Sequence, residues 1–221
     1  MLKFYHTPIS ANSRRVWVTL LEKQIEFEEI VLTLQGDQFN PEYLQINPFH
    51  HIPTIIDQDF TLIESLAILD YLEAKYPTPS FTPKEPESIG IMRMLELVTV
   101  NELLPTSLPL LKELVGLPSD PKQPIETVHK KVTIILDFYQ KYLGDNPYLV
   151  GEQMTLADIT VGTMVPVLKY FNISLENHPK LQAWCERLML RESWQKTEPN
   201  PEDIEASFTR IKTILTQKSP Q

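Results

Sequence analysis

Apolar and polar positions change their spacing about a third of the way along the chain. Up to residue 77, short strand-like runs alternate with helical runs, and after residue 87 apolar residues recur every three to four positions. The stretch between them, residues 77–87, holds four prolines and no helical period, which is typical of a semi-rigid linker. We therefore predict an α/β domain over residues 1–77, a linker over residues 78–87 and an all-helical domain over residues 88–221.

The first domain is predicted to run β-α-β, then an irregular stretch with three prolines, then β-β-α. The predicted segments are, in this order, Leu2–Tyr5, Ser13–Lys23, Glu26–Leu32, Thr54–Ile56, Phe60–Ile63 and Glu64–Tyr76. A β-α-β unit of this length implies parallel strands with a right-handed crossover, and the last two strands form a hairpin.

The second domain is predicted to be helical throughout. Its helices are expected at Ser88–Val115 (bent by Pro105 and Pro109), Pro124–Leu143, Leu156–Phe171, His178–Leu190 and Pro201–Thr216. The segment Leu156–Phe171 is apolar along nearly its whole length, so it should be buried on most sides.

Composition excludes several classes of function. A formal net charge of −9 disfavours binding to nucleic acid, and no apolar run is long enough for a membrane span or a signal peptide. The single cysteine, Cys185, excludes internal disulfides, fits a reducing cytoplasm and is expected to be an inert packed thiol. No Gly-rich phosphate loop and no His-rich metal motif is present, so we expect no metal. The acidic residues Glu22, Glu26, Glu28 and Glu29 suggest a solvated face.

A first candidate site lies in the segment His6–Arg15, where a strand ends, a polar loop follows and a helix begins. Hydroxyls at such a junction lie near the unpaired N–H groups of the helix start, a place that favours an anion. Ser10 can donate a hydrogen bond to a bound anion there. The alternative is that Ser13 is the N-cap and Ser10 an ordinary loop residue.

A second candidate site combines the segment His51–Thr54 with Glu64 and Ser65. A cis bond before Pro53 would turn the chain and present the backbone N–H and C=O of Ile52 to a peptide-like ligand. At the start of the following helix, Glu64 suits an ammonium group, and Ser65 with the helix N–H groups suits a carboxylate. The alternative is a proline turn followed by a helix cap.

A third pattern, Thr155-Leu156-Ala157-Asp158, is a capping box with aspartate in place of glutamate. It predicts a helix start and carries no chemistry.

Together these segments resemble a cytosolic glutathione S-transferase of the serine type. The resemblance runs from the first strand to the helix near Trp194. It is carried by the motifs Ile9–Val16, Asn47–Pro53, Leu62–Ile68, Tyr148–Gly151 with Thr155–Asp158, and Trp184 with Arg191–Trp194. The resemblance implies a thioredoxin-like domain followed by a helical bundle, a catalytic serine at Ser10, a cis-proline at Pro53 and a γ-glutamyl site at Glu64 and Ser65.

The sequence departs from the family pattern at one point that bears on binding. The Gly-Gln or Gly-Lys pair that usually precedes the valine-proline pair is His50-His51 here. The resemblance then implies that His51 and Gln38 meet the glycine carboxylate of glutathione, which makes binding sensitive to pH. Serine at position 10, where other groups of the family carry cysteine, argues against thiol-disulfide chemistry.

The resemblance implies an enzyme that transfers glutathione, its co-substrate, to small apolar electrophiles. The auxiliary groups would be Tyr5 as a fallback donor and Arg14 and Arg15 as sources of positive potential. The electrophile pocket would lie between the domains, with Ile9, Ala11, Leu104, Leu108 and Leu111 as walls, although the leucines equally suit the bundle core. A homodimer is implied, with Phe49 inserted into the partner, unless Phe49 is a half-buried loop residue. The alternatives are a non-catalytic binding or regulatory protein on this fold, or a specialised glutathione-dependent lyase, isomerase or peroxidase.

Overall fold

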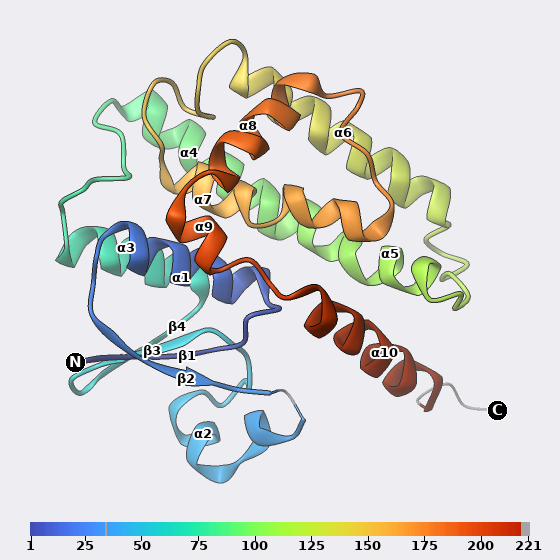
Figure 1. The fold of residues 1–221 in the computed structure, drawn as a ribbon, viewed down its shortest axis with the longest axis horizontal. Coiled ribbons are helices and arrows are strands. Elements are labelled where there is room, and N and C mark those ends of the chain that lie inside the picture. The colour runs from blue at the N-terminus through green and yellow to red at the C-terminus, as the bar shows by residue number, and fades with distance from the viewer. Residues whose placement is uncertain (34, 218–221) are drawn as a thin grey trace. The chain divides into compact units, whose positions relative to one another are not determined.

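The computed structural model describes residues 1–33 and 35–217 and consists of two compact units. The first comprises Met1–Thr82 together with Leu190–Glu198, and the second Pro83–Met189 together with Pro199–Gln221 (Figure 1). The sequence pattern did not predict that Leu190–Glu198 belongs to the first unit. The borders drawn at residues 77 and 88 stay predictions.

The first unit is built on a mixed four-stranded sheet with the strand order β2-β1-β3-β4. Its strands are β1 (Leu2–His6), β2 (Phe27–Val31), β3 (Thr54–Asp57) and β4 (Phe60–Ile63). β1 pairs parallel to β2 and antiparallel to β3, which forms a hairpin with β4. The predicted parallel pairing of the first two strands and the hairpin are therefore confirmed. The turn of the hairpin lacks glycine, and Gln58 takes the left-handed conformation there with φ +57°.

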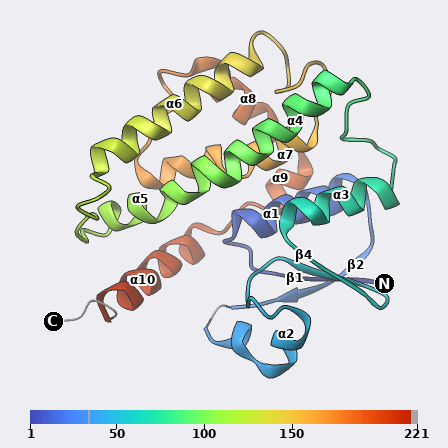
Figure 2. The ribbon, with the colours of Figure 1, turned by 180° about the vertical axis from the view of Figure 1, so that it is seen from behind.

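Helices α1 (Ala11–Glu22) and α3 (Ser65–Lys75) pack against each other on one face of this sheet, as Figures 1 and 2 show. Their apolar stripes form the core of the unit, in which Phe4, Val16 and Ile68 are fully buried. Apolar burial of this kind contributes about 25 cal/mol per Å². The core thereby fixes the ends of α1 and α3, where the candidate site residues lie.

The stretch predicted to be irregular contains a short helix, α2 (Pro41–Ile46), and a 3₁₀ turn at Asp37–Phe39. Six residues are too few to produce a recognisable helical period. Pro41 takes the first helical position, where its missing N–H costs no hydrogen bond.

The second unit is helical, as predicted. Its helices are α4 (Pro86–Val98), α5 (Ser107–Leu114), α6 (Ile125–Leu143), α7 (Leu156–Gly162), α8 (Pro179–Met189) and α10 (Pro201–Gln217). Between α4 and α5 the chain passes through a π-helical turn at Thr99–Leu103 and a 3₁₀ turn at Leu104–Thr106. Pro105 explains this irregularity because it has no N–H for the helical ladder, whereas Pro109 falls in the first turn of α5.

The prediction of one helix over Leu156–Phe171 was wrong. α7 ends at Gly162, and a 3₁₀ segment follows at Val165–Phe171. Pro166 removes the N–H that would bond to the carbonyl of Gly162, so the α-helix cannot continue. The near-complete burial predicted for this stretch is confirmed over α7, where every residue is buried.

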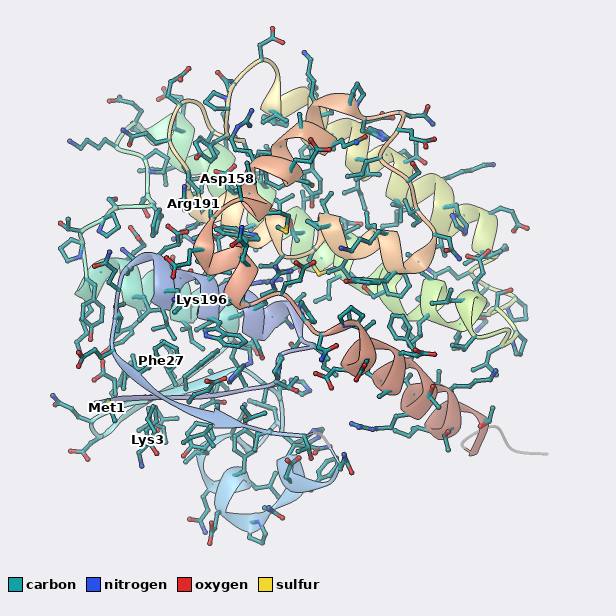
Figure 3. All side chains as sticks on the ribbon, viewed as in Figure 1. Met1, Lys3, Phe27, Asp158, Arg191 and Lys196 are labelled. Carbon is teal, nitrogen blue, oxygen red and sulfur yellow. The ribbon has the colours of Figure 1, made fainter. Side chains whose placement is uncertain are left out.

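The capping box is confirmed at the start of α7, and its Asp158, labelled in Figure 3, is fully buried. Its carboxylate accepts hydrogen bonds from the N–H groups of Leu149 and Thr155, each at 2.8 Å, and from Trp184 Nε1 at 2.9 Å. Burial raises the pKa of Asp158, and these donors oppose that rise. The residue thus ties three segments of the second unit together.

A short helix that the pattern did not predict, α9 (Glu192–Lys196), packs on α1 within the first unit. Arg191 Nε donates to Glu22 Oε1 at 2.8 Å, and Ser193 Oγ donates to the same carboxylate. The side chain of Glu22 is 11% exposed. Its assignment to a solvated face was therefore wrong.

Among the described residues, no helix is long and apolar enough to cross a membrane.

Candidate functional site

Ser10 forms the start of α1. Its extended backbone (φ −89°, ψ 119°) precedes the first helical residue, and its Oγ accepts the N–H of Ser13 at 3.3 Å. Ser10 is therefore the N-cap, and the alternative that placed the cap at Ser13 was wrong. The Ser13 side chain is buried, and its Oγ accepts the N–H of Thr7 at 3.4 Å. Both hydroxyls thus hold the loop against the helix.

The loop before β3 is held by a small polar network around the carbonyl of His51. Asn47 Nδ2 donates to that carbonyl at 2.8 Å, and the Tyr43 hydroxyl donates to it from α2. Both side chains also hydrogen-bond Thr54 Oγ1. Burial raises the pKa of Tyr43, so its hydroxyl stays protonated and able to donate.

Ile52 follows His51 in this loop, and its peptide bond to Pro53 is cis. The backbone N–H and C=O of Ile52 form no hydrogen bond with any described residue. A backbone amide and carbonyl without protein partners need water or a ligand. The N–H and C=O of Ile52 can therefore form hydrogen bonds with the backbone of a peptide-like ligand.

At the start of α3, Glu64 adopts a left-handed backbone with φ +68° and is exposed. The next residue, Ser65, is buried at 7% exposure, and its Oγ accepts a hydrogen bond from Arg15 Nη1 at 3.3 Å. The helix start places a carboxylate, a hydroxyl and unpaired N–H groups together, which suits the charged amino-acid end of a ligand.

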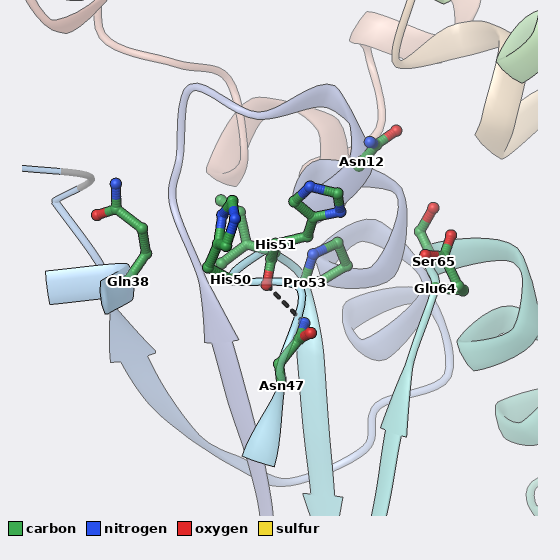
Figure 4. A pocket seen from close by; sticks show the side chains of 9 residues that line it. Asn12, Gln38, Asn47, His50, His51, Pro53, Glu64 and Ser65 are labelled. Atoms are coloured by element: carbon green, nitrogen blue, oxygen red, sulfur yellow. Dashed lines mark hydrogen bonds between the residues drawn. The ribbon is translucent and has the colours of Figure 1, made fainter. Parts of the chain in front are cut away.

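These three local structures line one pocket of about 410 Å³ in the first unit (Figure 4). The lining residues are Asn12, Gln38, Asn47, His50, His51, Ile52, Pro53, Glu64 and Ser65. All six residues predicted for glutathione binding are among them. Sequence reasoning did not assign Asn12, Asn47 or His50, although each stands inside a motif already singled out.

The pocket has chemically different ends. Glu64 and Ser65 lie on one side in Figure 4, and Gln38 and His50 on the other. A carboxylate and helix N–H groups at one end, with imidazoles and an amide at the other, match an extended peptide-like ligand that carries an amino-acid group and a second carboxylate. The volume falls within the range of about 300–1,000 Å³ for small-molecule sites.

His50 takes a left-handed conformation with φ +49°, at the position where the family pattern has glycine. Its ring packs 4.9 Å from the ring of Phe39 and 5.3 Å from that of His51, measured between ring centroids. A left-handed backbone costs a non-glycine residue roughly 1–2 kcal/mol. These ring contacts offset part of that cost.

Several predicted residues lie outside this pocket. Ser10 is not among the described residues that line it. Tyr5 is half-buried, with its ring centroid 5.7 Å from that of Tyr43. Arg14 is buried and donates to Thr197 Oγ1 and to the carbonyl of Trp194, so its charge is engaged in holding α9.

The residues predicted as electrophile walls differ in exposure. Ile9, Ala11 and Leu104 are half-buried, and Leu108 is 48% exposed. Leu111 is buried in the core of the second unit, which is the alternative that the pattern left open.

Two further groups bear on the chemistry. Cys185 is buried, and burial raises the pKa of its thiol to about 12, so it is not a thiolate at neutral pH. In the part of the chain that the structure describes, no three His, Cys, Asp or Glu side chains are grouped to hold a metal ion.

Comparison with known proteins identifies the family. Residues 4–80 match the glutathione S-transferase N-terminal domain and residues 103–192 the C-terminal domain. Glutathione S-transferase F10 of Arabidopsis thaliana is 32% identical over 209 residues, covering 89% of this chain and 96% of the relative. The chain belongs to the glutathione S-transferase family. Another relative is glutathione S-transferase 3 of Zea mays, 31% identical over 89% of this chain and 92% of its own.

Solved structures of this family share the fold. Glutathione transferase F7 from Populus trichocarpa has 26% identity and a TM-score of 0.77, covering 92% of this chain and 99% of that one. A delta-class glutathione transferase from Nilaparvata lugens has a TM-score of 0.82 at 23% identity, over 96% and 99% of the two chains, which supports the fold alone. This member therefore has a thioredoxin-like domain followed by a helical C-terminal domain.

Proposed function

We propose that this protein is a glutathione transferase that joins the glutathione sulfur to small, largely apolar electrophiles. The observation that carries the proposal is the single pocket lined by all six expected ligands of glutathione. In this pocket Glu64 takes the ammonium group of the γ-glutamyl end and Ser65 its carboxylate. Ile52 pairs with the cysteinyl backbone, Pro53 shapes the turn, and His51 with Gln38 meets the glycine carboxylate.

The reaction needs the thiolate form of glutathione, since a thiol of ordinary pKa near 8.5 is only a few per cent ionised at pH 7. The thiol proton passes to solvent, and the sulfur lone pair attacks an electrophilic carbon. A C–S bond forms while the leaving group departs with its bonding electrons. Lowering the thiol pKa by about two units needs about 2.7 kcal/mol, within the roughly 1.5–3 kcal/mol of one hydrogen bond to a charged acceptor.

Ser10 is the proposed donor of that hydrogen bond. Its oxygen accepts the N–H of Ser13, which leaves its own hydrogen for donation to the sulfur. Arg14 and Arg15 add positive potential along α1. Both residues are buried, which favours an additional structural role for each. Tyr5 is the weaker candidate because its ring packs on Tyr43.

For the electrophile we propose contacts with Ile9, Ala11, Leu104 and Leu108. Leu108 is the best supported of these, because a leucine that is 48% exposed on α5 remains available to an apolar ligand. Leu111 contributes less because it is buried.

We also propose a homodimer in the cytoplasm, where glutathione is kept reduced. Phe49 is 58% exposed beside Pro48, which favours its insertion into a partner subunit over the half-buried alternative. α4 adds an open hollow that includes Met94, Leu97 and Val98. Light scattering of Phe49→Ser tests this, and unchanged mass would exclude Phe49 as the anchor.

The decisive experiment measures glutathione binding by calorimetry together with turnover of an aryl halide, an isothiocyanate and a hydroperoxide. Ser10→Asp is the informative variant, because aspartate preserves the N-cap but places a negative charge beside the sulfur. We expect turnover to fall tenfold or more without loss of stability, whereas Ser10→Thr retains most activity. Binding without turnover of any substrate would favour a binding protein, and turnover of the hydroperoxide alone would favour a specialised peroxidase. Absence of binding would reject the proposal.

A further inference from the structure

The α1 side of the pocket is lined by Asn12 rather than by Ser10. Asn12 is the second residue of α1, and its side chain projects in Figure 4 between the His51 ring and the Ser65 hydroxyl. It is half-buried, and its Oδ1 is covered but has no hydrogen-bond partner in the described structure. Its amide nitrogen forms no hydrogen bond with a described residue either.

An unpartnered amide in a pocket calls for an explanation. A covered polar atom without a partner is destabilising, and the great majority of such atoms in proteins are paired. Asparagine at the first turn of a helix is usually explained by capping, but here Ser10 already provides the cap. The amide nitrogen of Asn12 also forms no hydrogen bond with a described residue and, unlike Oδ1, is not covered, so its N–H groups are available to a ligand.

The position of Asn12 specifies which part of the ligand it meets. In the proposed binding mode, the γ-glutamyl end lies at Glu64 and Ser65, the glycyl end at Gln38, His50 and His51, and the cysteinyl backbone at Ile52. The thiol then points to the remaining wall, which is the start of α1.

We infer that Asn12 is a second catalytic residue, whose side-chain amide donates a hydrogen bond to the glutathione sulfur and shares its stabilisation with Ser10. This rests on the proposed function. It goes beyond that function because it assigns the hydrogen-bond donor that lines the pocket to an asparagine, whose side chain does not titrate. A neutral amide contributes its N–H dipole without titrating, and it acts together with the unpaired N–H groups of the α1 N-terminus.

The test follows the ultraviolet absorbance of the bound thiolate as a function of pH in the full-length protein. We expect Asn12→Ala to raise the pKa of bound glutathione by about one unit, which is a tenfold change in its acid dissociation constant. Asn12→Asp should raise it further, because a carboxylate beside the sulfur repels the thiolate. A residue that only supports the helix would not produce this order.

Controls separate the possible failures. Gln45→Ala removes an exposed amide from α2 and should leave the thiol pKa and kcat/KM unchanged. If wild-type protein and all variants bind no glutathione, the proposed function fails and this inference fails with it. If wild type binds and turns over, but Asn12→Ala and Asn12→Asp leave the thiol pKa within about 0.2 units of wild type, the inference alone is overturned.

Discussion

Arg15 Nη1 donates to Ser65 Oγ over 3.3 Å, and through this bond a fully buried guanidinium on α1 orients a pocket-lining hydroxyl on α3. The bond joins the two helix starts of the candidate site. Because the serine oxygen accepts from Arg15, its hydrogen is directed away from the guanidinium. The Ser65 hydroxyl is thus oriented before any ligand arrives.

Arg15→Lys should weaken glutathione binding by about threefold to tenfold with a smaller effect on kcat. A lysine ammonium keeps the charge but cannot reproduce the planar geometry of the guanidinium. Calorimetry of glutathione binding and the split between KM and kcat provide the measurement. Arg187→Lys, at an exposed arginine of α8 that donates to the carbonyl of Pro147, is the matched control. Equal effects of both variants would refute a positioning role for Arg15.

Stability at acid pH should depend on Glu22. Burial by itself raises the pKa of this carboxyl, but hydrogen bonds from Arg191 and Ser193 and the charge of Arg191 together lower it. A lowered folded-state pKa stabilises the protein above the ordinary carboxyl pKa of about 4, and the gain is lost as pH falls through the folded value. Glu22→Gln should cost about 1 kcal/mol at pH 7, discounted for the partly exposed Arg191, and progressively less as pH falls below the ordinary carboxyl pKa.

Urea denaturation followed by circular dichroism at a series of pH values measures this effect. Glu26→Gln, at an exposed residue just beyond α1, is the control and should leave the pH dependence as in wild type. A Glu22→Gln curve parallel to wild type from pH 3 to 7 would contradict the assignment.

Asp158→Asn should destabilise the second unit by about 2–4 kcal/mol. The carboxylate accepts from Leu149, Thr155 and Trp184, and an asparagine amide group would face some of these donors with another donor. Asp145→Asn removes an exposed carboxylate that pairs with Lys180 and should leave stability close to that of wild type. The stabilities of the two variants are compared by their urea midpoints. Similar losses of stability would mean that the buried hydrogen bonds of Asp158 contribute no more than the exposed ion pair of Asp145.

Cys185 should resist alkylation in the native protein. Burial raises its pKa to about 12, so almost no thiolate exists at pH 8 to react. We expect iodoacetamide to label the thiol only as fast as the protein unfolds, and promptly in 8 M urea. Rapid labelling of native protein would show that the thiol is accessible and ionised.

Long elements with a clear period were predictable from sequence, and short ones were not. α6 and α10 follow from apolar spacing over many turns, whereas α2 and α9 have six and five residues. The packing of α9 depends on contacts such as Arg191–Glu22, which lie 169 residues apart in the chain. No local pattern encodes such a pairing, which is why Glu22 was assigned to a solvated face.

The candidate site likewise contains residues that could be predicted from the sequence and residues that could not. Pro53, Glu64 and Ser65 stand in motifs whose residue types already indicate their chemistry, and the fold brings them into one pocket. Asn12 gave no such signal, because an asparagine in a first helical turn is typical of capping. Only the folded structure shows that Asn12 lines the pocket and that Ser10 is the cap.

His51→Lys tests how the second residue of the His50-His51 pair, where the family pattern has glutamine or lysine, affects binding. His51 lines the pocket at the proposed glycyl end, and its carbonyl is held by Tyr43 and Asn47, so a new side chain starts from a fixed backbone. A lysine places an ammonium charge with three hydrogen-bond donors at this position. We expect glutathione to bind about threefold to tenfold more tightly at pH 8. The gain should shrink in 0.5 M salt, because part of it is screened charge attraction. Equal affinity of wild type and variant at pH 8 would place the glycine carboxylate out of reach of residue 51 and shift its recognition to Gln38 and His50.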